Sequence, residues 1–161
     1  MKRKTVIADA STLIGLSRIE QLDLLGDLYG EVIVPQSVYN EVVSESKHSS
    51  EKIKTAKYLK VEKVTDGKMV ELFLGYLGRG EAEALTLSKE KKADLILLDE
   101  KKARKAARRA GFEVVGVLGL LLAAKNTALI PAVRPFIAEL SKQGFRLSKK
   151  VIQRALKEAG E

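Results

Sequence analysis

The 161-residue chain contains no cysteine and no tryptophan, and it has a single histidine, His48. Without cysteine the protein cannot form disulfides, use a thiolate nucleophile or hold zinc through sulfur. His48 lies in a polar stretch between residues 44 and 54, where we interpret it as a surface residue and not as a general base. Any chemistry must therefore come from carboxylates, hydroxyls, lysine or arginine.

Long hydrophobic runs are also missing. No apolar stretch approaches the roughly 18 residues of a membrane-spanning helix, so we expect no membrane association. The basic N-terminus is followed by a short apolar run that Asp9 and Ser11 interrupt, which argues against a secretory signal and favours a cytoplasmic protein. The length fits a single domain over residues 1–161, with residues 131–161 as a C-terminal helical extension.

Negative charge is in deficit. The chain carries 29 lysines and arginines against 21 acids, a net charge of +8 with a sequence pI of about 9.6. Nucleic acid is the commonest partner of such a protein, and an acidic protein comes next. A thermophile's charged surface would explain the abundance of charges but not the positive excess. Aromatic residues make up only 5%, so base stacking should not dominate recognition.

Short apolar runs alternate with helical patterns along the chain. We expect strands at residues 6–8, 31–34, 95–98 and 113–115, with a weak edge strand within 59–64. Helices fill the segments between them, and Ser11 or Thr12 is the expected N-cap of the first. This alternation predicts an α/β fold, a three-layer α/β/α sandwich around a central parallel sheet of four or five strands.

Four carboxylates stand out in this basic chain. Asp9 and Asp99 directly follow buried strands, whose carboxyl ends lie at one edge of a parallel sheet. Glu41 lies about two turns into the helix after the second strand, and Glu81 begins the helix before the strand of Asp99. If these ends converge, the acids repel one another unless a divalent cation joins them. Their oxygen ligands suit Mg²⁺ or Mn²⁺, as one or two ions.

Each acid alone has an ordinary explanation: Asp9 as a helix cap, Glu41 and Glu81 as solvated helix charges. Asp94 is excluded, because it precedes its strand and belongs to the opposite edge. The segment after Asp99 favours the interpretation that the four acids form one site, since residues 101–109 carry six basic side chains and no acid. Its first turn should border the acids, and Lys101, Lys102 and Arg104 are the candidate contacts to a nucleic-acid backbone.

Several segments together resemble the PIN domain family. They are Val6-Ile7-Ala8-Asp9-Ala10-Ser11, Pro35 to Glu41, Gly80-Glu81-Ala82-Glu83-Ala84, Leu97-Leu98-Asp99, Gly116 to Leu121, Arg134-Pro135 and Gly144 to Ser148. The resemblance covers nearly the whole chain, and the tail looks like a prokaryotic subfamily often left without an assigned function. It implies a PIN-like sandwich, a Mg²⁺- or Mn²⁺-dependent ribonuclease that cuts RNA, and commonly a homodimer. Many members are VapC-like toxins neutralised by a small antitoxin protein.

Carried over by position, the resemblance makes Asp9, Glu41, Glu81 and Asp99 the metal-binding, catalytic acids, with Ser11 orienting Asp9 or a metal-bound water. The family usually has aspartate where this chain has Glu81, and Glu83 is a nearby rival. Residues two apart on a helix point in different directions, and Glu81 shares a face with Ala84, Leu85 and Ser88, so we favour Glu81.

Three other functions were weighed against a ribonuclease. A PIN fold that binds nucleic acid or an antitoxin without catalysis is the main alternative, although a degenerate site would usually lose one of the acids. A haloacid-dehalogenase-like phosphotransferase would need an aspartate where the chain has Ser11. A dinucleotide-binding loop is disfavoured, because the glycines between Gly75 and Gly80 have the wrong spacing.

Overall fold

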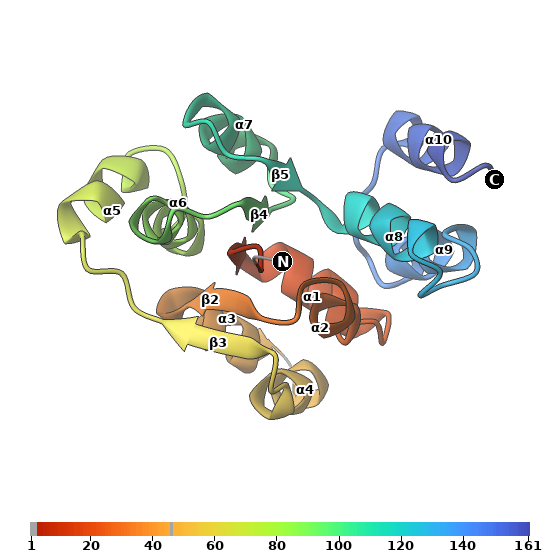
Figure 1. Ribbon diagram of the computed structural model, residues 1–161, viewed down its shortest axis with the longest axis horizontal. Coiled ribbons are helices and arrows are strands. Elements are labelled where there is room, and N and C mark those ends of the chain that lie inside the picture. The colour runs from red at the N-terminus through yellow and green to blue at the C-terminus, as the bar shows by residue number, and fades with distance from the viewer. Residues whose placement is uncertain (1–2, 46) are drawn as a thin grey trace.

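The computed structural model describes residues 3–45 and 47–161, which form five strands and ten helices (Figure 1). The strands are β1 (Val6–Ala8), β2 (Val32–Pro35), β3 (Leu59–Glu62), β4 (Leu95–Leu97) and β5 (Val114–Val115). The helices are α1 (Ala10–Arg18), α2 (Leu24–Tyr29), α3 (Gln36–Glu45), α4 (Lys47–Thr55), α5 (Gly67–Leu74), α6 (Arg79–Lys91), α7 (Lys101–Arg109), α8 (Val117–Asn126), α9 (Arg134–Lys142) and α10 (Lys149–Glu158).

All five strands are parallel, in the order β3-β2-β1-β4-β5. The predicted α/β/α sandwich is therefore confirmed, with five strands and with the weak strand of residues 59–62 at one edge. β1 lies in the middle and pairs with β4 through Ala8 and Leu97. The residues that follow these two strands thus emerge side by side at the carboxyl edge.

Strand residues alternate between two faces and build a core on each. Val6 and Ala8 face the larger core, to which α1, α3, α8 and α9 contribute, whereas Ile7 packs with Ala84 and Leu87 of α6. In Figure 1, α5 and α6 lie on one side of the sheet and α1, α8 and α9 on the other. Both faces are covered, which is why the strands read as continuous apolar runs.

The C-terminal helices pack on this larger core. Ile137 and Leu140 of α9 and Ala155 of α10 are buried in the same cluster as the β1 side chains. Ala155 is the buried residue of α10. This helix lies across from α7, on the opposite side of β5 (Figure 1).

The start of the first helix differs from its prediction. Asp9, and not Ser11 or Thr12, is the N-cap residue of α1, and its carboxylate makes no capping hydrogen bond. The reason is that the chain turns into a helix immediately after β1. An ordinary role as a capping side chain therefore does not explain Asp9.

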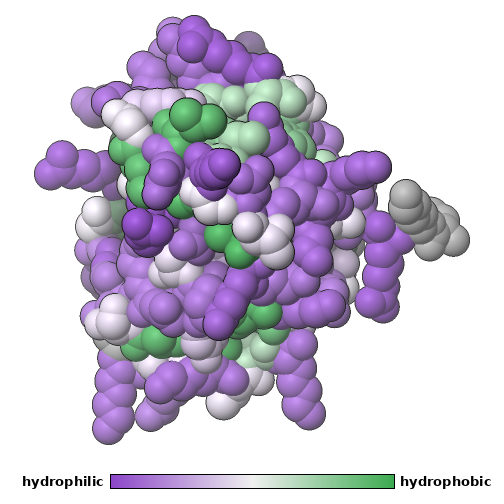
Figure 2. Space-filling model, turned by 90° about the vertical axis from the view of Figure 1, so that its left-hand side faces the viewer, coloured by the Kyte–Doolittle hydropathy of each residue, from purple (hydrophilic) through white to green (hydrophobic). Residues whose placement is uncertain are grey.

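The side of the molecule that carries α5 is mostly hydrophilic, with small separate hydrophobic areas (Figure 2). Leu72 is 72% and Tyr76 is 55% exposed. Leu77, in contrast, is buried in a smaller apolar cluster with Leu85, Ile96 and Leu98. Among the described residues, no helix is long and apolar enough to cross a membrane.

Candidate active site

The four predicted carboxylates come from four elements that meet at the carboxyl edge of the sheet. Asp9 follows β1 and Asp99 follows β4, while Glu41 comes from α3 and Glu81 from the first turn of α6. Gly80 lies between two of them: a Cβ there would stand 3.4 Å from Asp9 Oδ1 and 3.6 Å from Glu41 Oε1. Both carboxylates, together with Val38, whose Cγ2 would be 3.2 Å away, thus border the space over Gly80.

Asp9 is the most buried of the four, with only 4% of its surface exposed. Burial raises its pKa, the Ala10 N–H opposes this rise, and the negative charges of Glu81, Glu41 and Asp99 add to it, so that the pKa moves from 3.8 to about 7. The three side-chain charges that act on Asp9 are all negative. The fold therefore places a buried carboxylate in the field of three others.

Asp99 is held in place from both sides. Thr12 Oγ1 donates to Oδ2 at 2.6 Å, and the backbone N–H of Val117 donates to Oδ1 at 2.9 Å. Burial raises the pKa of Asp99, while these two bonds and the nearby Arg104 oppose that rise. A Cβ on Gly116 would lie 2.6 Å from Oδ1 and 2.7 Å from Arg104 Nη1, so this position has room only for glycine.

Glu81 points back toward the start of its own helix, where the Gly78 N–H donates to Oε1 at 3.0 Å. Burial raises its pKa, the Gly78 bond opposes this, and repulsion from Glu100 and Glu41 raises it further. Glu100 also shares a hydrogen bond with Glu81 and caps α7 through the Ala103 N–H at 2.9 Å. Sequence reasoning missed Glu100, although its place directly after Asp99 was the available signal.

Glu83, the rival of Glu81, is directed elsewhere. Its Oε1 accepts the backbone N–H of Ser37 at 3.2 Å, and Arg79 lies 3.9 Å from Oε2. It therefore serves the N-terminus of α3 at Ser37, about one turn away from Glu41 on the same helix, and it is not among the charges acting on Asp9. The geometry separates two glutamates that the sequence left as alternatives.

The hydroxyl groups near the acids are arranged differently from the prediction. Ser11 Oγ, expected to orient Asp9, is buried and has no hydrogen-bond partner within the described part of the chain. Thr12, which sequence reasoning used only as a helix cap, donates to Asp99 instead. Consecutive side chains on a helix point about 100° apart, so Thr12 can reach Asp99 while its neighbour Ser11 does not.

The donor set fits a hard divalent cation, since it consists of carboxylate oxygens around a buried acid whose charge is not compensated. Within residues 3–45 and 47–161, however, no three acidic or histidine side chains already stand in a metal-binding arrangement. Part of the reason is visible in the hydrogen bonds. Both oxygens of Asp99 already accept hydrogen bonds, from Thr12 and Val117, and one oxygen of Glu81 accepts a hydrogen bond from Gly78.

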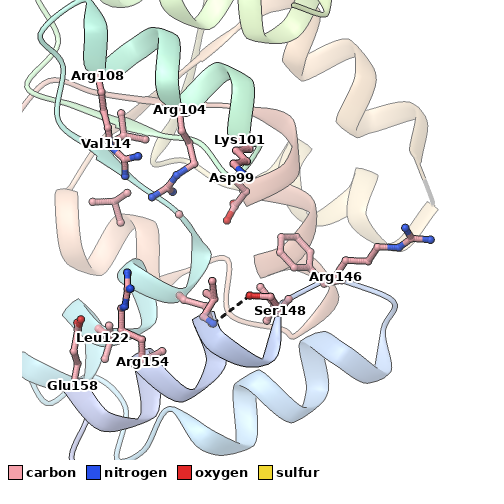
Figure 3. Close-up of a pocket in the computed structure, with 18 residues that line it drawn as sticks. Asp99, Lys101, Arg104, Arg108, Val114, Leu122, Arg146, Ser148, Arg154 and Glu158 are labelled. Carbon is pink, nitrogen blue, oxygen red and sulfur yellow. Dashed lines mark hydrogen bonds between the residues drawn. The ribbon is translucent and has the colours of Figure 1, made fainter.

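A groove of about 710 Å³ begins at Asp99 and runs between α7 and α10 (Figure 3). Of the three predicted contacts to a nucleic-acid backbone, Lys101 and Arg104 line this groove, whereas Lys102 is exposed and is not part of its lining. Three further arginines line it that sequence reasoning did not single out: Arg108, Arg146 and Arg154. The spacing of four residues between Arg104 and Arg108 was the signal for the first of these.

An all-parallel sheet with acids gathered at its carboxyl edge defines an α/β protein with a site of nuclease type. The family model described as a PIN domain matches residues 5–161, and the chain belongs to the PIN domain family. PIN domains are generally nucleases, typically use divalent metals and act on nucleic acid. A comparison with curated protein sequences gave no match.

Proposed function

We propose that the protein is a metal-dependent endoribonuclease in which Asp9, Glu41, Glu81 and Asp99 hold one or two Mg²⁺ or Mn²⁺ ions. The observation that carries this proposal is the convergence of four carboxylates, from four elements, at the end of a groove lined by arginines. Acids alone would repel an RNA phosphate, and bases alone would bind it without cleaving it. Together they match what hydrolysis of a phosphodiester requires.

The bound cation would make a water more acidic and neutralise charge on the phosphate. Water adds to the phosphorus and the 3′-oxygen leaves, so one product carries a 5′-phosphate. Thr12 and the Val117 N–H fix the orientation of Asp99. Lys101 and Arg104 lie where they can contact the phosphate backbone next to Asp99, and Lys102, outside the groove, is a weaker candidate for such a contact. Ser11, whose hydroxyl has no hydrogen-bond partner among the described residues, is a weaker candidate for orienting Asp9.

The test is cleavage of single-stranded RNA with Mn²⁺, with Mg²⁺ and with EDTA. The parent should cleave only with metal, and Asp9→Asn should be inactive under all three conditions. Glu71→Gln changes an exposed acid on α5 and is the matched control, expected to cleave like the parent. If Asp9→Asn cleaves as fast as the parent, the proposal is wrong.

A binding module without catalysis is the second candidate. It is favoured by one observation, the lack of a ready-made metal-binding arrangement among the described residues. It predicts salt-sensitive RNA binding and no cleavage with any metal. Cleavage that depends on Mn²⁺ and on Asp9 would rule it out.

The finer assignments that the family suggests are also proposals: a toxin neutralised by a small antitoxin, a homodimer, and action in the cytoplasm. The exposed Leu72 of α5 and Tyr76, in the turn after it, are the surface that we connect with dimer formation. Light scattering of the parent and of Leu72→Glu would test the dimer, because a charge in an apolar interface should produce monomers.

A further inference from the structure

Most of the groove between α7 and α10 lies beyond the residues that the proposed hydrolysis uses. Its lining carries five cations against two acids. These residues are Lys101, Arg104, Arg108, Arg146 and Arg154, with Asp99 and Glu158. The groove is therefore strongly positive along its length and negative only near its two ends.

The cations stand on both walls. Arg104 and Arg108 are four residues apart on α7 and extend toward the gap, and Arg154 reaches into it from α10 (Figure 3). The two α7 guanidinium groups are close enough for Arg108 to lower the pKa of Arg104, in addition to the larger effect of burial. Asp99 lies near Arg104, but the five cations of the lining outnumber its two acids, and positive groups held near one another in this excess are placed for an anionic ligand with repeated charges.

The floor between these walls is aliphatic. β5 and α8 supply Val115, Leu118 and Leu122, and α10 supplies Val151, which is 46% exposed. The aromatic residue in the lining is Phe145, whose ring fills the space over Gly15, where a Cβ would stand 2.9 Å from the ring. This contact fixes the ring against α1, so the floor offers apolar contact more than stacking.

A chain in which charges alternate with less polar groups would match this lining, and a nucleotide strand has that character. The groove volume of about 710 Å³ lies within the roughly 300–1,000 Å³ of ligand pockets, room for about two nucleotides but not for a double helix. Because the groove ends at Asp99, a strand lying in it continues directly to the carboxylates.

We propose that the groove between α7 and α10 binds one flank of a single-stranded RNA, with Arg108 and Arg154 contacting its phosphates from opposite walls. The aliphatic floor receives sugars and bases without selecting among the bases. As a description of substrate binding, this rests on the proposed ribonuclease function; as an RNA-binding site, it does not.

The test measures binding separately from cleavage. Fluorescent oligouridylate is titrated with protein in EDTA over a series of salt concentrations. The double variant Arg108→Ala/Arg154→Ala should bind about tenfold more weakly, and the slope of log K against log salt should shrink by about 1.4, or 0.7 for each lost phosphate contact. Arg109→Ala/Lys157→Ala removes the same charge from positions outside the groove on the same helices, and should stay within about twofold of the parent.

Equal affinity of the groove variant and the parent would overturn the proposal. So would equally tight binding of a blunt RNA duplex, which contradicts a single-strand groove. Tighter binding of a polyglutamate peptide than of oligouridylate would instead assign the groove to an acidic protein partner.

Cleavage in Mn²⁺ separates this proposal from the ribonuclease assignment. If the groove variant loses binding and the parent cleaves nothing, the RNA groove stands and the proposed function fails. If the parent cleaves RNA and the groove variant cleaves equally fast at low RNA concentration, the proposed function stands and the groove assignment fails.

Discussion

Asp9 shows at the scale of one residue what the site costs the fold. It is buried beside three other acids, and the folded protein holds its proton more tightly than the unfolded chain does. Ionisation of Asp9 therefore opposes folding. This cost is absent below pH 3.8, grows between 3.8 and about 7, and is complete above 7.

Asp9→Asn should therefore stabilise the metal-free protein above pH 7. The gain is at most about 4 kcal/mol from a shift of this size, and we expect an increase in Tm on the order of 5–10 °C. Thermal melts in EDTA at pH 8 and at pH 4 measure it. The difference between variant and parent should shrink at pH 4, because this pH lies only just above 3.8, where the cost of ionising Asp9 in the folded protein begins.

Mn²⁺ should reverse the order of the two proteins. It should raise the Tm of the parent, because it binds the folded state, and leave Asp9→Asn unchanged. An equal Mn²⁺-induced increase in both proteins would mean that Asp9 is not a metal ligand.

Gly116→Ala tests the close packing around Asp99. The added methyl would come within 2.6 Å of Asp99 Oδ1 and 2.7 Å of Arg104 Nη1, so the carboxylate must move. The backbone at Gly116 (φ −94°, ψ −175°) is extended and suits alanine, so no backbone strain is added. RNA cleavage should fall by about tenfold or more.

Gly67→Ala is the control for this change, since a Cβ there meets nothing within 4 Å. It should cleave RNA like the parent. Full activity in Gly116→Ala would show that the position of Asp99 has no importance for the reaction.

At the scale of elements, two glutamates near the start of α6 have two different tasks. Glu81 turns toward the acids, whereas Glu83 reaches across to the N-terminus of α3. Glu81→Gln should keep the bond to Gly78, since an amide oxygen can accept it, but should weaken metal binding. Glu83→Ala should instead lower the free energy of unfolding by about 1 kcal/mol through the lost helix cap.

Urea unfolding and the Mn²⁺-induced change in Tm separate the two roles. Glu83→Gln should retain the full Mn²⁺ effect, and Glu81→Gln should lose most of it. The reverse result would make Glu83 the third metal-binding acid.

At the scale of the whole molecule, Glu161 ties the last residues of the chain to the α8–α9 connection. Its carboxylate accepts the backbone N–H groups of Val133 at 2.7 Å and Arg134 at 3.0 Å, and Lys125 Nζ lies 2.9 Å away. These bonds lower the pKa of Glu161 to about 2. The contact steadies α10, one wall of the RNA groove.

Because this pKa is lowered, the stabilisation is complete above 4.5 and is lost as the pH falls through about 2. Glu161→Gln should have a lower Tm than the parent at neutral pH, and the two melting curves should converge toward pH 2. Glu71→Gln, without such contacts, should show no pH-dependent difference. Parallel curves for Glu161→Gln and the parent would contradict the role of this carboxylate.

Local sequence signals predicted much of this architecture. Apolar runs such as Leu95–Leu98 must be buried on both faces, and helical patterns between them leave few alternatives to a parallel sheet. Asp9 and Asp99 could be placed at the carboxyl edge because each follows its strand directly. The N-cap of α1 was predicted wrongly. The preference of N-caps for a hydroxyl pointed to Ser11 or Thr12, but the helix begins directly after the strand, which makes Asp9 the N-cap.

The sequence by itself determined the sheet, the two aspartates at its edge and the basic character of α7, since these depend on local patterns and strand direction. Only the tertiary structure decided that Glu81 and not Glu83 faces Asp9, that Thr12 holds Asp99, and that Arg154 stands opposite Arg108. Those facts depend on the packing of helices far apart in the chain. No local pattern specifies such packing, because it is the product of the whole core.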